Sequence, residues 1–375
     1  MSDVLVVGAG VIGLGVAWRC AQRGLGVTVV DPAPGSGAST TAAGMLAPVT
    51  ELHYGEQSLL KLNLDSAARY PAFADELSGV TGLAVGYRRT GTVSAGWDAA
   101  DLAALRDLRA FGQTLGLSSE MLTSQDLRRL EPALAPGLPG GLFAPDDHQV
   151  DNRALHAALL TAAEAAGALI MPRRVAELRI EADRAVGLTL DGGERLDAGV
   201  TVLAAGSWSP QIAGVPADLV PVRPVKGQTL QLRVAGKPLL AHVVRGTVQG
   251  SPVYLVPRDD GRIVVGASSE EAGFDLRPRA GAVYELLRDA QALLPALGEA
   301  EFLEVSTSVR PATADNAPLI GPSGIDGLIL ATGHYRNGIL LTPVTADSVA
   351  AYVAGEPPPD VVTPFTPMRP SKVGP

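Results

Sequence analysis

The hydrophobic positions of the chain begin with a short β-branched run at residues 4–7 and recur as a second run at residues 27–30. Continuous apolar runs of this length are typical of buried parallel strands. The apolar segment 14–23 between them is predicted to be a helix. Near the C-terminus, a strand at 327–331 is followed by a predicted helix at 339–355. Strand–helix units at both ends of the chain predict an α/β domain.

The middle of the chain follows another pattern. Strand-length apolar or alternating runs between residues 228 and 267 include the turn signal Asp259-Asp260-Gly261, which is typical of a hairpin. These runs predict an antiparallel sheet in a second, α+β domain. The proline-rich stretch from Pro357 is expected to be disordered or draped over the surface. The expected boundaries are 1–80, 141–220 and 319–360 for a discontinuous nucleotide-binding domain, 81–140 and 221–318 for a substrate domain, and 361–375 for a tail.

The turn after the first strand carries the pattern Gly8-x-Gly10-x-x-Gly13, and Asp31 follows the second strand. In this Rossmann-type fingerprint the glycines allow a tight turn, a close approach to a pyrophosphate and close packing of the helix on the strands. The helix N-terminus offers N–H groups to phosphates. The carboxylate of Asp31 would accept hydrogen bonds from ribose hydroxyls, and its negative charge would repel a 2′-phosphate, which disfavours NADP. The fingerprint therefore predicts a dinucleotide cofactor, and leaves FAD and NAD open.

The charge and hydrophobicity of the chain argue against two classes of partner, nucleic acids and membranes. The 375 residues carry a net charge of -9 with no Lys/Arg run, which argues against nucleic acid. The longest nearly apolar run, 4–18, is shorter than the ~20 residues of a spanning helix. No basic segment precedes this run, so a cytoplasmic protein without a membrane partner is expected. The single cysteine, Cys20, excludes an intramolecular disulfide and is expected in the helix core.

Candidate side chains for chemistry are few. Arg310 ends an apolar strand, which suits bidentate capture of a substrate carboxylate, or alternatively an interdomain ion pair. Tyr254 would donate to the same carboxylate, or alternatively be a half-buried strand aromatic. Arg336 lies in the last glycine turn before a helix, where negative charge is favoured. The five histidines lack metal-binding spacing, so a cofactor is expected to carry the chemistry.

Two further segments have alternative interpretations. Residues 35–46 are rich in small residues. They form either a flexible loop or a second backbone surface against the cofactor, with hydroxyls near phosphate and Met45 near the ring. The pair Asp146-Asp147 is expected in a solvated turn.

Together the motifs resemble the D-amino-acid oxidase superfamily of FAD-dependent amine oxidases, over nearly the whole chain. The residues that carry the resemblance are 7–13, 42–46, 224–227, 253–258, 309–311 with 315–318, and 333–341. It implies FAD rather than NAD, and an α/β fold with a Rossmann-type FAD-binding domain beside a substrate domain that has an antiparallel sheet. Because Cys20 lies in the first helix and residues 39–45 include no histidine, non-covalent FAD is expected.

The resemblance also implies site residues. Arg310 and Tyr254 would hold the substrate carboxylate, and Arg336 would help to close the site. The implied cofactor-binding residues are Gly8, Gly10, Val11, Ile12, Gly13, Asp31, Thr40, Thr41, Ala43, Gly44, Met45, Leu46, Val175, Gly206, Gly333, Tyr335, Arg336, Asn337, Gly338, Ile339 and Leu340.

The implied reaction is oxidative deamination of glycine and small amines, including sarcosine and small D-amino acids. Its products would be the imine or 2-oxo acid, ammonia and, with dioxygen as electron acceptor, hydrogen peroxide. The imine would hydrolyse or supply the thiazole moiety of thiamine. Orientation supplies much of the acceleration, so no general base is required. A homo-oligomer such as a tetramer is also implied. The alternatives are a D-amino-acid dehydrogenase or oxidase with larger substrates, a sarcosine-type oxidase, an NAD-dependent dehydrogenase, and a non-catalytic flavin-binding protein.

Overall fold

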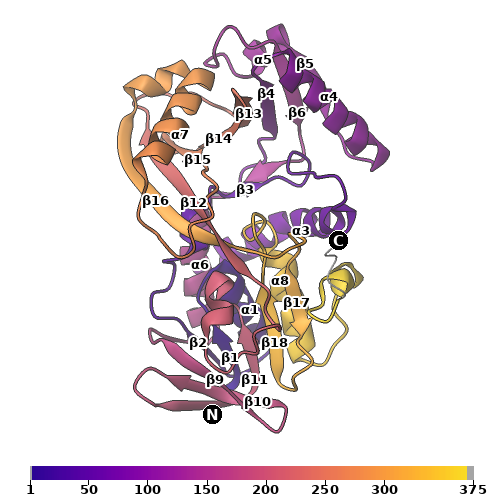
Figure 1. Cartoon of the computed structure of the whole chain (residues 1–375), viewed down its shortest axis with the longest axis vertical. Helices are drawn as coiled ribbons and strands as arrows, with labels where there is room; N and C mark the ends of the chain where they lie inside the picture. The colour runs from indigo at the N-terminus through magenta and orange to yellow at the C-terminus, as the bar shows by residue number, and fades with distance from the viewer. Residues whose placement is uncertain (1, 370–375) are drawn as a thin grey trace.

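Two large sheets lie toward opposite ends of the molecule (Figure 1). The computed structural model describes residues 2–369. The first sheet has the order β17-β18-β11-β1-β2-β8, in which the strands from β18 to β8 run parallel and β17 is antiparallel. β9 and β10 extend this sheet as an antiparallel flap on β11. The strands are β1 Ser2–Val7, β2 Val27–Val30, β8 Leu169–Met171, β9 Val175–Glu181, β10 Arg184–Leu190, β11 Arg195–Leu203, β17 Leu319–Pro322 and β18 Leu328–Thr332.

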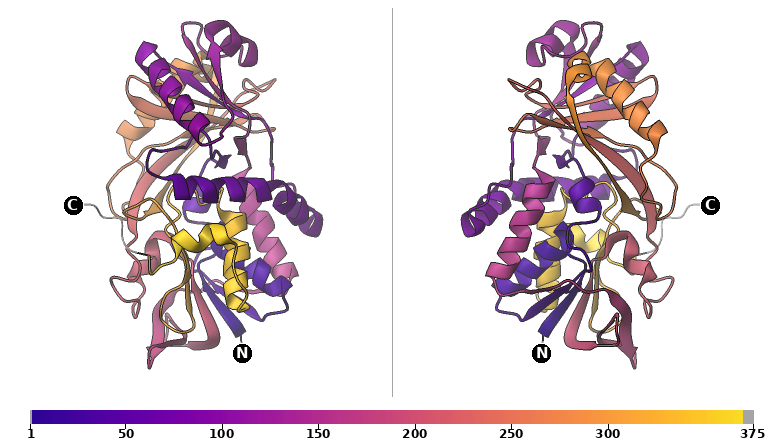
Figure 2. Two further views of the ribbon diagram at one scale, coloured as in Figure 1. Left: turned by 90° about the vertical axis from the view of Figure 1, so that its right-hand side faces the viewer. Right: turned by 90° about the vertical axis from the view of Figure 1, so that its left-hand side faces the viewer.

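Both faces of the parallel strands are buried, which explains their continuous apolar runs. Along β1, Val4 and Val6 belong to the core under the helices, whereas Leu5 and Val7 belong to the core on the opposite face. The helix α1 packs between α6 and α8, and α3 lies across both of them at the middle of the molecule (Figure 2). These helices are α1 Val11–Gln22, α3 Gln57–Thr81, α6 Asn152–Ala165 and α8 Thr342–Val353.

The second sheet has the order β16-β12-β15-β14-β13-β4-β6-β5 and is antiparallel except for the β13–β4 pair. This confirms the predicted antiparallel sheet and the α/β class. The elements are β4 Thr92–Gly96, α4 Ala99–Thr114, β5 Glu120–Thr123, α5 Ser124–Leu130, β6 Gly140–Ala144, β12 Arg223–Arg233, β13 Val243–Val248, β14 Ser251–Pro257, β15 Arg262–Gly266, α7 Ala280–Leu293, η2 Pro295–Glu299 and β16 Glu301–Ala312. The exact domain boundaries stay a prediction.

Two helices begin at positions other than those expected. α1 begins at Val11 rather than at residue 14, because Gly13 and Gly15 are packing positions inside the helix: a Cβ at Gly15 would lie 3.2 Å from the Cβ of Ala346. α8 begins at Thr342 rather than at residue 339, because residues 338–341 form a turn in which Leu341 N donates to Asn337 O at 2.8 Å.

The described part of the tail is packed rather than disordered. The short 3₁₀ helix η3, Asp360–Phe365, buries Val362 and Phe365 in the core beneath α3. Arg369 then pairs with Asp315 at 3.0 Å. The expectation for residues 370–375 lies outside the described residues.

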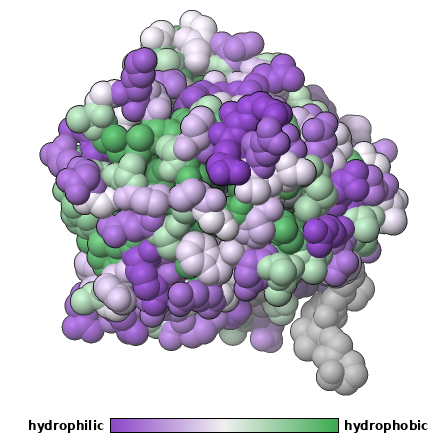
Figure 3. Space-filling view, turned by 90° about the horizontal axis from the view of Figure 1, so that it is seen from above, coloured by the Kyte–Doolittle hydropathy of each residue, from purple (hydrophilic) through white to green (hydrophobic). Residues whose placement is uncertain are grey.

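The surface is mixed in character. Seen from the end that carries the second sheet, hydrophobic residues lie among hydrophilic ones (Figure 3). Large exposed hydrophobic side chains include Tyr54 before α3 and Tyr284 on α7. Among residues 2–369, no helix is long and apolar enough to cross a membrane.

Candidate cofactor and substrate site

The turn from β1 into α1 has no room for side chains at two of its glycines. Gly8 has φ +106°, and a Cβ there would lie 2.5 Å from the carbonyl oxygen of Ala204. A Cβ at Gly13 would lie 1.9 Å from the oxygen of Gly8. Gly10 is the N-cap of α1 and has no side chain to cap the helix. Leu14 N donates to Gly10 O at 2.9 Å, so the N–H groups of Ile12 and Gly13 precede the first intrahelical bond and are oriented toward the space before the helix.

Asp31 ties the end of β2 to this turn. Its Oδ2 accepts a hydrogen bond from Ala9 N at 2.7 Å, and its Oδ1 accepts one from Ala33 N at 2.8 Å. The carboxylate is partly exposed and keeps further lone pairs for a ribose. Met171 O accepts Asp31 N at 3.2 Å, and Val175 begins β9 four residues later. Asp31, predicted to bind the ribose, and Val175, predicted to lie near the adenine, therefore follow the paired strands β2 and β8.

Within the small-residue segment 35–46, residues 38–46 contain short regular elements, which favours the second-surface interpretation over a flexible loop. They comprise the short helix α2, Ala38–Thr41, and the strand β3, Met45–Leu46, which pairs with β7, His148–Gln149. Gly44 has φ +75°, and a Cβ there would lie 2.0 Å from Val150 O. Ser39 Oγ accepts a hydrogen bond from Val11 N at 3.1 Å, which places this segment beside the N-terminus of α1.

The C-terminal glycine turn is held from two sides. In α3, Tyr70 donates to Ile339 O at 2.8 Å and Ser66 donates to Leu340 O at 2.6 Å. From β16, Pro311 O accepts Tyr335 N at 3.0 Å, so the turn lies next to the strand that carries Arg310. The turn residues expected at the cofactor are Gly333, Tyr335, Arg336, Asn337, Gly338, Ile339 and Leu340. Gly206, which begins the 3₁₀ helix η1, Gly206–Gln211, accepts from Thr332 Oγ1 just before this turn, at 3.1 Å.

Tyr254 and Arg310 extend toward each other over the second sheet. Tyr254 on β14 pairs with Gly266 on β15, where a Cβ would lie 2.3 Å from the tyrosine Oη. Arg310 on β16 extends over Gly227 on β12, and its Nη1 donates to Ser268 O at 3.1 Å. Burial raises the pKa of Tyr254, although the charge of Arg310 opposes the shift, so the phenol remains a donor.

The same sheet face meets the 38–46 segment. Ala43 lies in one small apolar cluster with Val243, Val256 and Val264 of the second sheet, and Met45 and Tyr254 pack against it. The structure therefore brings together residues that are about 200 positions apart in sequence.

Arg336 lies at the edge of this region, beside an acid that the sequence analysis missed. Glu51 Oε1 accepts Arg245 Nη1 at 2.6 Å, and its Oε2 lies 3.6 Å from Arg336 Nε. Burial would raise the pKa of Glu51, but Arg245, Arg336 and His53 together bring it below its ordinary value. Arg245 was also missed, although it pairs directly with Tyr254 across the β13–β14 hairpin. A register built from that hairpin would have identified it.

The expectation for Asp147 is wrong, because this residue is fully buried. Its Oδ1 accepts Val49 N at 2.8 Å, and its Oδ2 accepts Thr50 N at 2.9 Å and Thr50 Oγ1 at 2.5 Å. Burial raises the pKa of Asp147 to about 6 despite these donors. The carboxyl fixes the segment that leads to Glu51. Asp146 is exposed, as expected.

The imidazole of His334 and the thiol of Cys20 are not positioned for acid–base or nucleophilic catalysis. Burial lowers the pKa of His334 to about 3, so its imidazole is neutral, and Nε2 lies 3.0 Å from Thr345 Oγ1. Cys20 is buried as expected, and burial raises the pKa of its thiol to about 12. Within the described residues, no three His, Cys, Asp or Glu side chains gather as a metal site.

A glycine turn at a helix N-terminus, an acid at the end of the next strand and an ordered second surface fit a dinucleotide in extended form. The face of the second sheet that carries Tyr254 and Arg310 lies beside the segment that contains Ala43 and Met45. This combination defines a dinucleotide-dependent oxidoreductase of the two-sheet type.

The chain belongs to the FAD dependent oxidoreductase family, whose model matches residues 3–352. The cofactor is therefore FAD, and the NAD-dependent alternative is excluded. The expected relation to the FAD-dependent amine oxidases is confirmed by the individual similarities.

Glycine oxidase from Geobacillus kaustophilus is 35% identical over 356 residues, which are 94% of this chain and 92% of that protein. Its crystal structure superposes with a TM-score of 0.90 and covers 98% of this chain and 99% of that one. The bifunctional protein ThiO/ThiG of Synechocystis is 35% identical over 98% of this chain. The chain spans about half the length of the bifunctional relatives, 52–54%. Iminodiacetate oxidase from Chelativorans is 29% identical, with a TM-score of 0.87 over 97% of this chain and 98% of that one.

Proposed function

We propose that the protein oxidises glycine and other small amino acids or secondary amines, such as sarcosine, at the bond between Cα and nitrogen. The observation that carries this proposal is the approach of Arg310 and Tyr254 over Gly227 and Gly266, next to Met45, which is expected to lie near the flavin. A planar guanidinium and a phenol on one face match the carboxylate of an amino acid. The similarity to glycine oxidases supports the same substrate class.

The residues of the chain perform binding and orientation. Arg310 binds the carboxylate through two parallel N–H donors, and Tyr254 donates its hydroxyl, which burial keeps protonated. FAD, when bound, supplies the two-electron oxidation. The side chains fix the Cα of the substrate against the apolar surface around Ala43 and Met45, which excludes water. His334 is neutral and is bonded to Thr345, so no histidine base is assigned.

The wider site carries an excess of positive charge that suits an anionic substrate. Arg245, Arg310 and Arg336 lie around the proposed position of the carboxylate, and Glu51 neutralises part of this charge through Arg245 and Arg336. Arg336 is exposed and lies at the rim, where it closes the site over the bound substrate.

The electron acceptor and product fate follow from the same proposal. Dioxygen accepts the electrons and yields hydrogen peroxide. The imine hydrolyses to the 2-oxo acid and ammonia, or to the 2-oxo acid and methylamine when sarcosine is the substrate, or the glycine imine enters thiazole formation. The names of the ThiO/ThiG relatives and of the putative thiamine biosynthesis oxidoreductase ThiO of Rhizobium etli support the thiamine link. Non-covalent FAD, a cytoplasmic location and a homo-oligomer belong to this proposal as expectations.

Peroxide formation with glycine, sarcosine, D-alanine and D-proline tests the function. Glycine and sarcosine are expected to give the highest kcat/KM. Larger D-amino acids as the preferred substrates would favour the alternative oxidase. Flavin reduction by substrate without peroxide formation in air would indicate a dehydrogenase. A holoenzyme that no amino acid reduces would refute the proposal.

A further inference from the structure

The hairpin between β14 and β15 carries a buried arginine, Arg258, whose side chain contacts the 38–46 segment. Arg258 follows β14 directly, and its side chain is only 5% exposed. Its Nη2 donates to Ala43 O at 2.7 Å and lies 3.3 Å from Asn152 Oδ1, and its Nη1 donates to Gln149 Oε1 at 2.9 Å. One guanidinium therefore joins the second sheet to β7, to the start of α6 and to the 38–46 segment.

Arg258 is one of four side chains that bind carbonyl oxygens of this segment. All four donors come from outside it, and they reach four of the five carbonyls in residues 39–43. The pairs are Asn152 Nδ2 to Ser39 O at 2.8 Å, Arg153 Nε to Thr40 O at 3.2 Å, Thr229 Oγ1 to Thr41 O at 2.9 Å and Arg258 Nη2 to Ala43 O. Because a trans peptide is planar, the N–H groups of Thr40, Thr41 and Gly44 point away from these donors.

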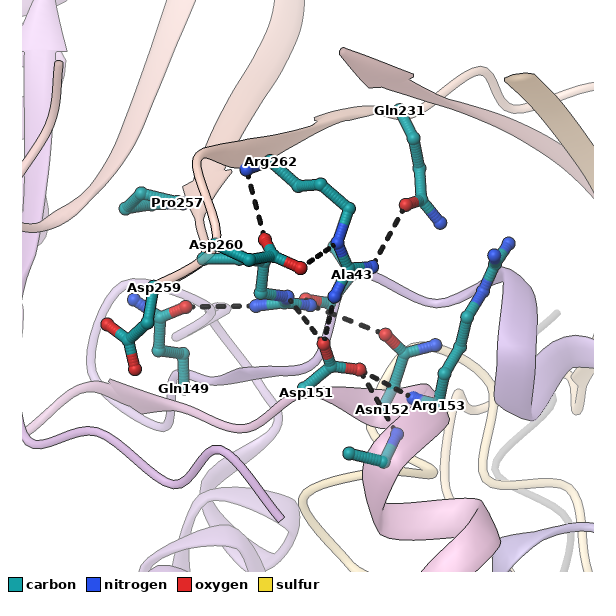
Figure 4. A network of polar contacts seen from close by, with 12 residues as sticks. Ala43, Gln149, Asp151, Asn152, Arg153, Gln231, Pro257, Asp259, Asp260 and Arg262 are labelled. Atoms are coloured by element: carbon teal, nitrogen blue, oxygen red, sulfur yellow. Dashed lines mark hydrogen bonds and ion pairs between the residues drawn. The ribbon is translucent and has the colours of Figure 1, made fainter. Parts of the chain in front are cut away.

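Two of the four donors are charged, Arg153 and Arg258, and they differ in burial: the side chain of Arg153 is 37% exposed and pairs with Glu304, whereas that of Arg258 is 5% exposed. Burial lowers the pKa of Arg258 to about 10, so it stays a cation at neutral pH. Asp151 balances this cation: its Oδ2 lies 3.5 Å from Arg258 Nε and 2.9 Å from Arg262 Nη2. Figure 4 shows Asp151 between Arg262 of the hairpin and the first turn of α6. Burial raises the pKa of Asp151, but Arg258, Ala154 N and Arg262 hold it below its ordinary value.

We propose that Arg258 is a positioning residue that fixes and polarises the Ala43–Gly44 peptide on the cofactor-facing surface. A charged donor on Ala43 O strengthens the Gly44 N–H at the opposite edge of the same peptide. A stronger N–H favours the negative charge that FAD gains on reduction, so Arg258 raises the flavin potential and tightens FAD binding. The inference rests on the proposed placement of residues 43–46 beside FAD.

Arg258→Met and Arg258→Lys test this role, with Arg262→Met as the matched control. Arg262 comes from the same hairpin and binds the same Asp151, but its other donors reach Asp260 and Gln231 rather than Ala43. The measurements are FAD release from the holoenzyme on dilution, the flavin midpoint potential and the flavin absorption spectrum. None of them requires an amine substrate, so a holoenzyme without amine oxidase activity would refute the proposed function and leave this test intact.

Arg258→Met is expected to weaken FAD binding at least tenfold and to lower the midpoint potential. Arg258→Lys, with charge but without the planar fork, is expected to recover part of both. Arg262→Met should stay within twofold of the unaltered protein. A folded Arg258→Met protein with unchanged FAD affinity and potential would overturn the inference, as would an equal loss in Arg262→Met. If Arg258→Met does not fold, unchanged values in Arg258→Lys would overturn it.

Discussion

The guanidinium of Arg310 lies directly over the backbone of Gly227 on the neighbouring strand. A Cβ at position 227 would be 2.5 Å from Cζ and from both terminal nitrogens of Arg310, a distance that real Cβ atoms essentially never show. Gly266 stands in the same relation to Tyr254. Glycine weakens a strand interior. Its presence at both positions is explained by the two flat side chains that lie above it.

Gly227→Ala is therefore expected to displace Arg310 while the sheet stays folded. We expect KM for glycine to rise about tenfold, since a shift of the guanidinium costs at least one of two charged hydrogen bonds. FAD content should stay the same. Steady-state kinetics and the flavin spectrum check this. Gly281→Ala in α7, where an added Cβ meets open space, is the control. An unchanged KM in Gly227→Ala would show that Arg310 does not bind the carboxylate from this position.

Arg310→Ala tests the anchor itself. Loss of a bidentate charged pair should raise KM roughly 100-fold, since each charged hydrogen bond contributes about 1.5–3 kcal/mol. FAD should remain bound. Substrate titrations that follow flavin reduction give both quantities. Arg233→Ala is the control, because this exposed arginine also lies in the sheet and pairs with Glu301 at 3.6 Å. If KM barely changes, Arg310 is structural.

The parts of the site that were predictable from sequence are local. Gly8, Gly13 and Asp31 lie within one β–α–β unit, so their spacing determines their geometry once the strands pair. The glycine turn at 333–338 was likewise recognisable, although α8 starts later than predicted because the turn continues to residue 341.

The parts that were missed depend on packing between distant segments. Glu51 forms ion pairs with Arg245 and Arg336, which are about 200 and 285 positions away in sequence. From sequence, Asp147 is predicted to be a solvated turn residue. Its burial depends on the backbone N–H groups of Val49 and Thr50, which donate to its carboxylate. Neither the burial of these acids nor their partners follows from hydrophobic periodicity, because periodicity describes one element at a time.

Glu51→Gln should release both Arg336 and Arg245. We expect a stability loss of about 2 kcal/mol near pH 7, since a charged acceptor is lost from a largely buried pair. The pKa of Glu51 lies below its ordinary value of 4.5 in the folded protein. Its carboxylate therefore stabilises the fold fully above pH 4.5, and this contribution is lost as pH falls through the lower folded value.

Denaturant unfolding of the Glu51→Gln variant at several pH values checks this expectation. The stability difference from the unaltered protein should be constant between pH 8 and pH 6 and should shrink in the acid range. Glu76→Gln, which breaks a surface pair with Arg19, should have little effect. A Glu51 difference that grows as pH falls would contradict the depressed pKa.

FAD should leave the protein when the chain is denatured. Covalent attachment needs a nucleophilic side chain beside the flavin, but Cys20 is buried in α1 and burial raises the pKa of its thiol to about 12. Residues 39–45, which are proposed to lie beside the cofactor, include no histidine or cysteine. Acid precipitation of the holoenzyme should therefore release yellow flavin into the supernatant, measured by its absorbance. Flavin that stays with the washed precipitate would demonstrate a covalent bond and would require a nucleophile elsewhere in the chain.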